Sequence, residues 1–233
     1  MIVGGELGEC TSGQISGVAP TLLVPVGSIE QHGPHLPLDT DTRIAVALAG
    51  RLGADLGHLT APAIAYGASG EHQGFPGTVS IGTEALTALL VEYGRSACDW
   101  APRLVFVNGH GGNTEALRAA VGLLRTEGRD AGWCSASVVG GDAHAGHTET
   151  SLLLHLSPDL VVVEKFVTGN VEPLSELMAA MRSGGIAAVS ESGVLGDPRT
   201  ATAAAGEQIF AGMLADCAVR IRRWIPDDVG MLT

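Results

Sequence analysis

The sequence predicts an α/β protein in which a mainly parallel sheet carries helices on both faces. Two observations point to this fold class. Short apolar runs alternate with longer amphipathic stretches along most of the chain, and 33 glycines accompany an aromatic content of only 4%. Repeated strand–helix alternation produces parallel strands joined by helical crossovers. The glycines suit the many tight turns that such a fold requires.

Four short apolar runs are expected to form buried strands of this sheet. They occupy residues 21–27, 59–67, 103–109 and 131–140. The first run, TLLVPVG, is apolar at almost every position, which is typical of a strand covered on both faces. These four runs therefore define the order in which the chain crosses the sheet.

Longer amphipathic stretches follow the strands and are expected to form helices. They occupy residues 42–57, 82–100, 113–127, 146–156 and 203–224. The second of them starts with a Thr/Glu pair, a common signal at helix N-termini. We expect a further strand–helix alternation in the C-terminal third of the chain.

Length and charge restrict the classes of function. A chain of 233 residues suits one domain, so we expect a single domain over 1–233. The net charge of −12 argues against binding to nucleic acid, which needs lysine and arginine. No apolar run is long enough for a membrane span, which predicts a cytoplasmic protein with no membrane partner. Charged residues make up only 16%, which favours buried subunit interfaces and thus a homo-oligomer.

Polar and reactive side chains follow each predicted strand. Glu30 and His32 follow the first strand, and the segments 70–77, 108–113 and 141–149 follow the other three. With His35, which also follows the first strand, these loops carry six of the eight histidines. Ligands of open parallel sheets bind at the carboxyl ends of the strands. The sequence therefore predicts one functional site at that edge.

The residue types in these loops favour a divalent metal. Glu30 and His32 are two apart in an extended segment, so their side chains point to the same side. With a nearby aspartate, Asp39 or Asp41, they offer mixed nitrogen and oxygen ligands, and His110 is placed to reach the same edge. Other interpretations stay open at this point. The Glu-x-His pair occurs in solvated loops, Asp39 suits a helix cap, and GHGGN is glycine-rich but lacks the spacing of known phosphate-binding loops.

Four motifs in order make the resemblance to one family specific. GSIEQHGPHLPLDTDT, GEHQGFPGTVSIG, VFVNGHGGN and HAGHTETS resemble the creatininase family of amidohydrolases over nearly the whole chain. The resemblance implies a three-layer α/β/α, creatininase-like fold and a site for two divalent ions per subunit. It also implies a ring-shaped homo-oligomer, a hexamer or larger.

By position, the resemblance assigns roles to the reactive residues. Glu30 and His110 are implied as ligands of one ion and His32 as a ligand of the other, with Asp41 bridging both. A water or hydroxide between the ions would attack the scissile carbonyl, since paired ions activate water in this way. His144 is then the candidate acid that protonates the leaving amine.

Two positions depart from the family pattern. Members that hydrolyse creatinine carry a ligand glutamate where Gly112 stands, so we expect Glu149 to complete the second metal site and to act in catalysis. His147 occupies a position that is glutamate in many relatives, and we expect it to contact substrate or to assist His144. His72 and Phe75 are expected on the substrate side. The mixed ligand set suits Fe²⁺ or Zn²⁺, with Mn²⁺ also compatible.

Several longer stretches fit one branch of the family, peptidases that cut a modified ribosomal precursor peptide. PLDTDTRIA, APAIAYGASGEHQGFPGTVSIGTEAL and GVLGDPRTATAAAGEQIF are among them. The implied activity is hydrolysis of the amide before the modified C-terminal Val-Tyr of the precursor, which releases a cyclised dipeptide-derived product. The alternatives are an amidohydrolase for a small cyclic amide or a formamide, and a catalytically silent binding protein.

Overall fold

The structure is a computed structural model that describes residues 4–138 and 140–233. Its centre is a five-stranded parallel sheet in the order β1-β3-β2-β4-β5. The strands are β1 (Gly5–Glu6), β2 (Thr21–Val26), β3 (Leu59–Thr60), β4 (Arg103–Asn108) and β5 (Ala131–Ser135). The longest pairing joins β2 and β4, which run side by side over six residues each.

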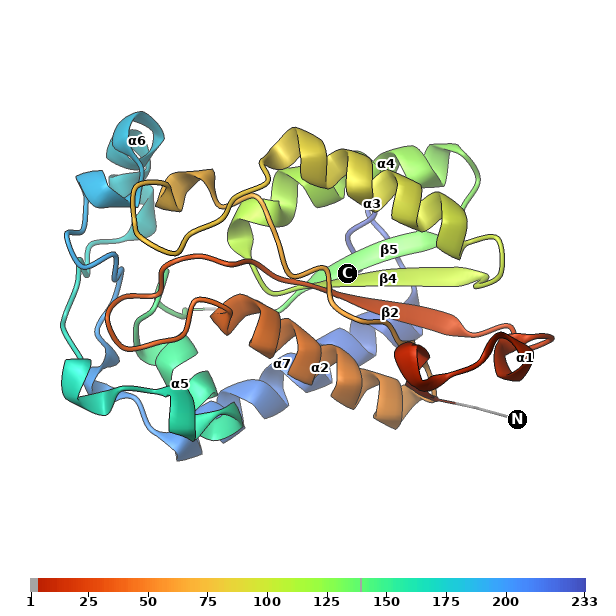
Figure 1. The fold of residues 1–233 in the computed structure, drawn as a ribbon, viewed down its shortest axis with the longest axis horizontal. Coiled ribbons are helices and arrows are strands. Elements are labelled where there is room, and N and C mark those ends of the chain that lie inside the picture. The colour runs from red at the N-terminus through yellow and green to blue at the C-terminus, as the bar shows by residue number, and fades with distance from the viewer. Residues whose placement is uncertain (1–3, 139) are drawn as a thin grey trace.

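Helices cover both faces of this sheet (Figure 1). They are α1 (Ser12–Ile15), α2 (Thr40–Leu56), α3 (Thr83–Ala97), α4 (Thr114–Thr126), α5 (His147–Leu156), α6 (Leu174–Gly184) and α7 (Ala203–Arg223). One face carries α3 and α4, and the opposite face carries α2, α5 and α7. The expected three-layer α/β/α fold is therefore confirmed.

Alternating side chains of the central strands divide the core into two halves. Leu104 and Phe106 of β4 pack with the α3 and α4 side, whereas Val105 and Val107 pack with α2, α5 and α7. All four are fully buried. Successive side chains of a strand point to opposite faces of the sheet, so an uninterrupted apolar run serves both halves of the core.

The predicted helices agree closely with the structure, but two expectations about strands were wrong. The run 59–67 forms only the short β3 and an isolated pairing of Ile64 with Val26, because Pro62 has no amide hydrogen to continue a ladder. The run 131–140 forms β5 up to Ser135, and Val139 lies outside the described residues.

The C-terminal third does not continue the strand–helix alternation. Among the described residues after β5, the structure has helices, 3-10 turns and isolated pairings such as His144 with Leu195. Glycine and proline recur between α5 and α7 and interrupt regular elements there. This segment passes over the carboxyl edge of the sheet, where α6 lies apart from the other helices (Figure 1). No helix within the described ranges is long and apolar enough to cross a membrane.

Two glycines of α7 provide a matched test of this packing. Gly206 lies against α5, where an added Cβ would clash with the Ser151 carbonyl oxygen and lie 3.0 Å from the His155 Cβ, whereas Gly212 faces open space. We expect Gly206→Ala to lower the free energy of unfolding by about 1–3 kcal/mol through overpacking. Gly212→Ala should raise it by about 0.5–1 kcal/mol, because alanine favours helix. Urea unfolding followed by circular dichroism measures both, and equal effects would contradict the described α5–α7 contact.

Candidate metal centre

The loops at the carboxyl edge of the sheet converge on one group of titratable side chains. We call this group the Asp41 cluster, and it consists of Glu30, His32, Asp41, His72, His110, His144 and Glu149. Every member is buried except Glu149, which is half-buried. They come from the loop after β2, the first turn of α2, the 3-10 turn at 70–72, the loop after β4, and the loop before α5 with its first turn. The sequence-based expectation of a single site at this edge therefore agrees with the geometry.

Asp41 lies at the centre of the cluster and faces two histidines with different oxygens. Its Oδ1 is 3.1 Å from His32 Nε2, and its Oδ2 is 3.0 Å from His110 Nδ1. Ser28 Oγ donates a hydrogen bond of 2.8 Å to Oδ2. Burial would raise the pKa of this carboxyl, but His32 and His110 outweigh burial and hold the pKa well below its usual range. A carboxylate with this geometry is suited to bridge two cations.

Asp41 owes its position to close contact between α2 and the ends of two strands. A Cβ at Gly27, just after β2, would overlap the backbone of Thr42, and a Cβ at Gly109, just after β4, would overlap the Asp41 carbonyl oxygen. Glycine is required at both positions, because any side chain would push the first turn of α2 away from the sheet.

Asp39 lies outside the cluster. It precedes α2 but makes no side-chain cap, and its carboxylate pairs with Arg43 at 2.7 Å. Of the two aspartates that the sequence left in competition, only Asp41 therefore belongs to the cluster.

Glu30 is a buried carboxylate without a satisfied oxygen. Its Oε1 lies 3.2 Å from His72 Nε2 and its Oε2 lies 3.2 Å from His110 Nε2. Neither approach has the geometry of a hydrogen bond, and neither oxygen has a hydrogen-bond partner among the described residues. Burial, with Asp41 nearby, raises the pKa of Glu30 to about 7. A buried carboxylate that lacks donors is costly, and a divalent cation would satisfy it.

The cluster contains two ligand sets, and Asp41 belongs to one of them and contacts His32 of the other. One set is Glu30, Asp41 and His110, and the other is His32, His144 and Glu149, each with one ligand atom per residue within 4.8 Å of the others. Glu149 Oε2 lies 3.9 Å from His32 Nε2 and accepts a hydrogen bond of 2.6 Å from the amide of Ala145. Mixed imidazole and carboxylate sets are typical ligands of divalent transition metals. The residues present therefore fit two such ions.

His144 has its free ring nitrogen turned toward the carboxylates. Its Nε2 donates to the backbone carbonyl of Gln31 at 2.8 Å, so Nδ1 carries the lone pair, 3.9 Å from Glu30 Oε1 and 4.0 Å from Glu149 Oε2. Burial, together with His32, holds the pKa of His144 well below its usual range. A neutral imidazole in this position can take a proton from the site or bind a metal. Its predicted acid/base role stays a prediction.

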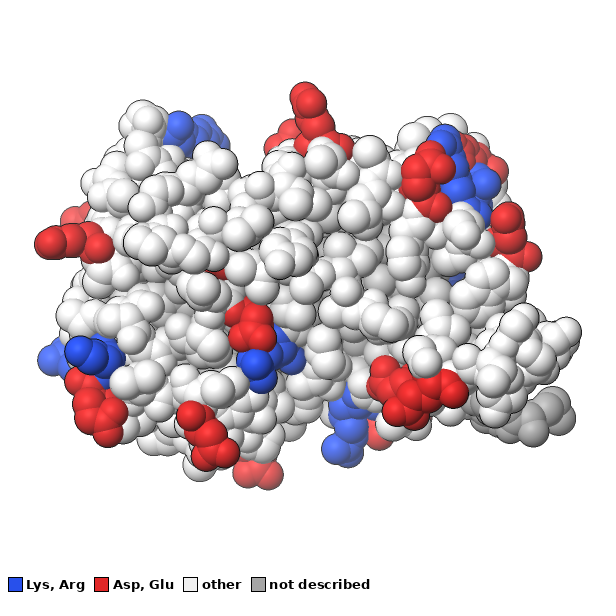
Figure 2. Space-filling model, viewed as in Figure 1, with Lys and Arg blue, Asp and Glu red and all other residues white. Residues whose placement is uncertain are grey.

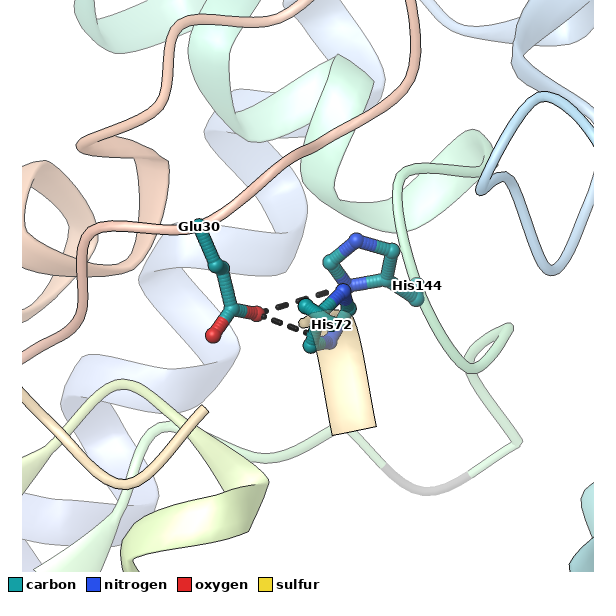
Figure 3. A group of neighbouring side chains, drawn as sticks. All are labelled: Glu30, His72 and His144. Atoms are coloured by element: carbon teal, nitrogen blue, oxygen red, sulfur yellow. Dashed lines mark ion pairs between the residues drawn. The ribbon is translucent and has the colours of Figure 1, made fainter. Parts of the chain in front are cut away.

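His72 lies inside the cluster as well as beside the cavity (Figure 3). The rings of His72 and His144 approach the same oxygen of Glu30, and these three residues form a third possible ligand set. Burial, with His110 nearby, lowers the pKa of His72 to about 3, which keeps the ring neutral. The expected contact of His72 with substrate stays a prediction, and the geometry adds a metal-ligand role as an alternative.

Two expected substrate residues lie farther from the cluster. Phe75 packs against the small apolar group formed by Leu177, Ile186 and Leu195. His147, at the start of α5, has Nδ1 2.8 Å from Thr200 Oγ1. Neither residue lines the cavity described next, and their contact with substrate stays a prediction.

A cavity of about 440 Å³ opens onto the cluster. Glu30, Asp41, His72, His110, His144 and Glu149 line one part of it, and Glu71 and Gly112 lie beside them. Its other part is lined by α6 and the segment after it. Cavities of this size hold small-molecule ligands and substrates.

Comparison with known proteins agrees with this site. The family profile described as "Creatininase: Creatinine amidohydrolase" matches residues 9–221. The chain belongs to the creatininase family. A "Mycofactocin precursor peptide peptidase" of Mycolicibacterium smegmatis is 66% identical, over 97% of this chain and 94% of the relative. A protein of the same name from Mycobacterium tuberculosis is 64% identical, over 98% of this chain and 95% of the relative.

Solved structures of the creatininase family share the fold. "Crystal structure of creatinine amidohydrolase (creatininase)" has a TM-score of 0.79 at 26% identity and covers 96% of this chain and 99% of that one. "Creatininase Mn" has a TM-score of 0.77 at 27% identity and covers 95% of this chain and 99% of that one. The name of the second structure includes manganese, in keeping with a metal-dependent family.

Gly112 leaves room for another carboxylate in this member of the creatininase family. A Cβ at position 112 would overlap Ala68 O and His110 Nε2 and lie 2.6 Å from Glu71 Oε1. Glu71 Oε1 is itself 3.5 Å from His110 Nε2. A glutamate at position 112 therefore has no space in this backbone, and Glu71 occupies the volume beside His110.

Sequence reasoning missed the polar residues that support the cluster. Gln31 Nε2 lies 2.9 Å from His72 Nδ1 and 3.1 Å from the Gly193 carbonyl, and Ser28 supports Asp41. The sequence did offer one signal for Gln31 and Ser28, which is their position close to the expected ligands Glu30 and His32. For α6 the available signal was weak, because nothing in its sequence indicates that it reaches the site.

Substitution of neighbouring glycines tests the geometry around His110. We expect Gly112→Ala to displace His110 and to weaken divalent-metal binding by roughly 10–100-fold, the usual effect of disturbing a ligand's support. Gly111→Ala is the matched control, because a Cβ there meets no atom within 4 Å. Metal competition titration measures both variants. Equal affinities for the two would contradict the contact described at Gly112.

Metal binding should release protons and strengthen as the pH rises. Burial would lower the pKa values of His32 and His110, but Asp41 and the glutamates outweigh burial and raise them to about 10 and about 9. Without metal, both imidazole rings are therefore doubly protonated and positively charged at neutral pH. A metal must displace one of these protons to bind. We expect affinity to increase by up to roughly tenfold per pH unit for each proton displaced, up to about pH 9.

Isothermal titration calorimetry in buffers of different ionisation enthalpy counts the protons released on metal binding. An affinity that is constant between about pH 6 and about pH 8.5, with no proton release, would contradict protonation of His32 and His110 in the metal-free protein.

Proposed function

We propose that this protein is a metal-dependent peptidase that hydrolyses the amide before the modified C-terminal Val-Tyr of the mycofactocin precursor peptide. The product is the cyclised, dipeptide-derived fragment. The observation that carries this proposal is the buried Asp41 cluster, with its two ligand sets, at the end of a cavity. The 66% identity to a mycofactocin precursor peptide peptidase supports the choice of substrate.

In this proposal, each residue of the cluster has a role in the hydrolysis. Glu30 and His110 would hold one ion and His32 and Glu149 the other, with Asp41 as a ligand for both. Two divalent ions at these positions would supply an activated water and polarise the scissile carbonyl. The water's oxygen joins the carbonyl carbon, the C–N bond breaks, and the leaving nitrogen receives a proton.

His144 is the residue that we propose for the proton transfer. Its neutral ring, with the Nδ1 lone pair toward the carboxylates, can accept the proton that the attacking water loses and deliver it to the leaving amine. The amide of Ala145 restrains Glu149, the side chain of Gln31 contacts His72, and the backbone carbonyl of Gln31 accepts a hydrogen bond from His144. These contacts hold the groups in place before substrate arrives.

We further propose Fe²⁺ or Zn²⁺ as the native ions, with Mn²⁺ as a substitute, in a single cytoplasmic domain over 1–233. We also propose a homo-oligomer, of hexamer size or larger by resemblance to the family. Exposed apolar residues after α5, including Val163 and Val171, the latter 67% exposed, support a subunit interface. The face in Figure 2 carries few charged side chains, most of them toward its outline. A ribosomally made precursor is available in the cytoplasm.

A second candidate is an amidohydrolase for a small cyclic amide or a formamide. The shared fold with solved creatininases supports this alternative. Gly112 disfavours creatinine as the substrate, because the glutamate that members hydrolysing creatinine use as a metal ligand at this position is missing.

Incubation with the cross-linked precursor peptide tests the proposed function. We expect the metal-loaded protein to release the C-terminal product, a chelator to abolish the release, and added divalent metal to restore it. Asp41→Asn should lower the rate by roughly 100-fold or more, because the bridging position needs an anionic oxygen for each ion. Asp39→Asn, which alters a half-buried pair with Arg43 outside the cluster, is the matched control. Mass spectrometry follows the products.

Intact precursor after incubation with the metal-loaded protein would contradict the peptidase proposal and favour the small-amide alternative. Full activity of Asp41→Asn would contradict the role given to the bridge.

A further inference from the structure

The cavity above the Asp41 cluster has two unlike walls. The wall formed by the cluster carries carboxylates and imidazoles. The opposite wall is mainly apolar, and it is formed by Leu174, Met178, Met181, Ile186 and Leu195 together with one charged residue, Arg182. A site that only bound a small polar amide would not need a second wall of this kind, since apolar surface contributes by removing apolar groups from water.

Helix α6 supplies most of this apolar wall with one of its faces. Leu174, Met178 and Met181 follow the spacing i, i+4, i+7, so they share a side of the helix, and all three line the cavity. Leu177 does not line the cavity and is buried with Ile186 and Leu195 in a small apolar group separate from the two main core halves. This small group holds α6 over the site.

The wall is joined to the cluster at two points. Leu195 pairs with His144 through backbone hydrogen bonds, with the amide of each residue donating to the carbonyl of the other, at 3.2 and 2.8 Å. Gly185, with φ of +67°, ends α6 so close to the Glu71 carbonyl that a Cβ would lie 2.6 Å from it. Glu71 precedes His72, so the end of α6 and the cluster are positioned together.

We propose that the inward face of α6, together with Leu195, is the subsite for a bulky, apolar or aromatic group on the amine side of the scissile amide. This inference rests on the proposed function, in which His144 delivers a proton to the leaving nitrogen. The substituent of a nitrogen held at His144 lies next to Leu195, and from there it extends along Met181 and Met178. The acyl side of the substrate is left to the opposite end of the cavity.

The residue types suit an aromatic occupant. Methionine is flexible and polarisable and makes favourable contacts with aromatic rings. Met178 is half-buried and Leu174 is exposed, so part of this apolar face is open to a ligand. Burial of a ring against these side chains would remove apolar surface of both partners from water.

Binding of two matched amides tests the subsite. N-acetylvaline phenethylamide and N-acetylvaline methylamide share the acyl part and differ only in the amine substituent. We expect the metal-loaded protein to bind the phenethylamide at least about tenfold more tightly, the scale of discrimination that a hydrophobic pocket provides. Met178→Glu should remove most of this preference, and Met181→Ala should reduce it.

Ala179→Glu is the matched control, because Ala179 is exposed on the same helix and receives the same charge. Metal content and circular dichroism establish that each variant is folded and loaded, and calorimetry measures the binding. Retention of the preference by Met178→Glu, or its absence in the unmodified protein, would overturn the inference.

Cleavage of the cross-linked precursor, measured in parallel, separates the two proposals. Cleavage without any preference between the amides overturns the subsite alone. A preference that depends on Met178, in a protein that leaves the precursor intact, supports the subsite and contradicts the proposed peptidase activity.

Discussion

The contact of one buried carboxylate with two histidines organises the functional end of this protein. Asp41 faces His32 and His110 with separate oxygens at 3.1 and 3.0 Å. An ionised carboxylate with only 1% of its surface exposed is stable only when cations or donors surround it. In the metal-free protein the protonated rings of His32 and His110 supply the positive charge beside Asp41. In the loaded enzyme two divalent ions would supply it.

The fold meets this requirement through the closeness of α2 to the sheet. Gly27 and Gly109 end the two central strands without side chains, which lets the first turn of α2 lie between them. Each remaining member of the cluster then arrives on a loop from the same edge, as the topology of a parallel sheet allows. The apolar core that stabilises the fold therefore borders directly on the polar Asp41 cluster at this edge of the sheet.

Much of this arrangement was predictable, because it depends on local pattern. Apolar periodicity placed the helix 203–224, observed as Ala203–Arg223, and the loop motifs placed Glu30, His32 and His110 at one edge. Contacts between distant segments were not predictable in this way. The return of the chain after α5 to place Leu195 beside His144, and α6 over the cavity, depends on tertiary packing. The expectation of a longer strand over 59–67 was wrong because Pro62, visible in the sequence, interrupts a run whose other residues fit a strand.

The most direct test of this account is a crystal structure of the metal-loaded protein with anomalous scattering measured at the metal absorption edge. The account predicts two anomalous peaks about 3.5–4 Å apart, one on each side of the Asp41 carboxylate. Glu30 and His110 should lie at one peak, with His32 and Glu149 at the other. A single peak, or two peaks that do not share Asp41, would contradict the central role of this residue.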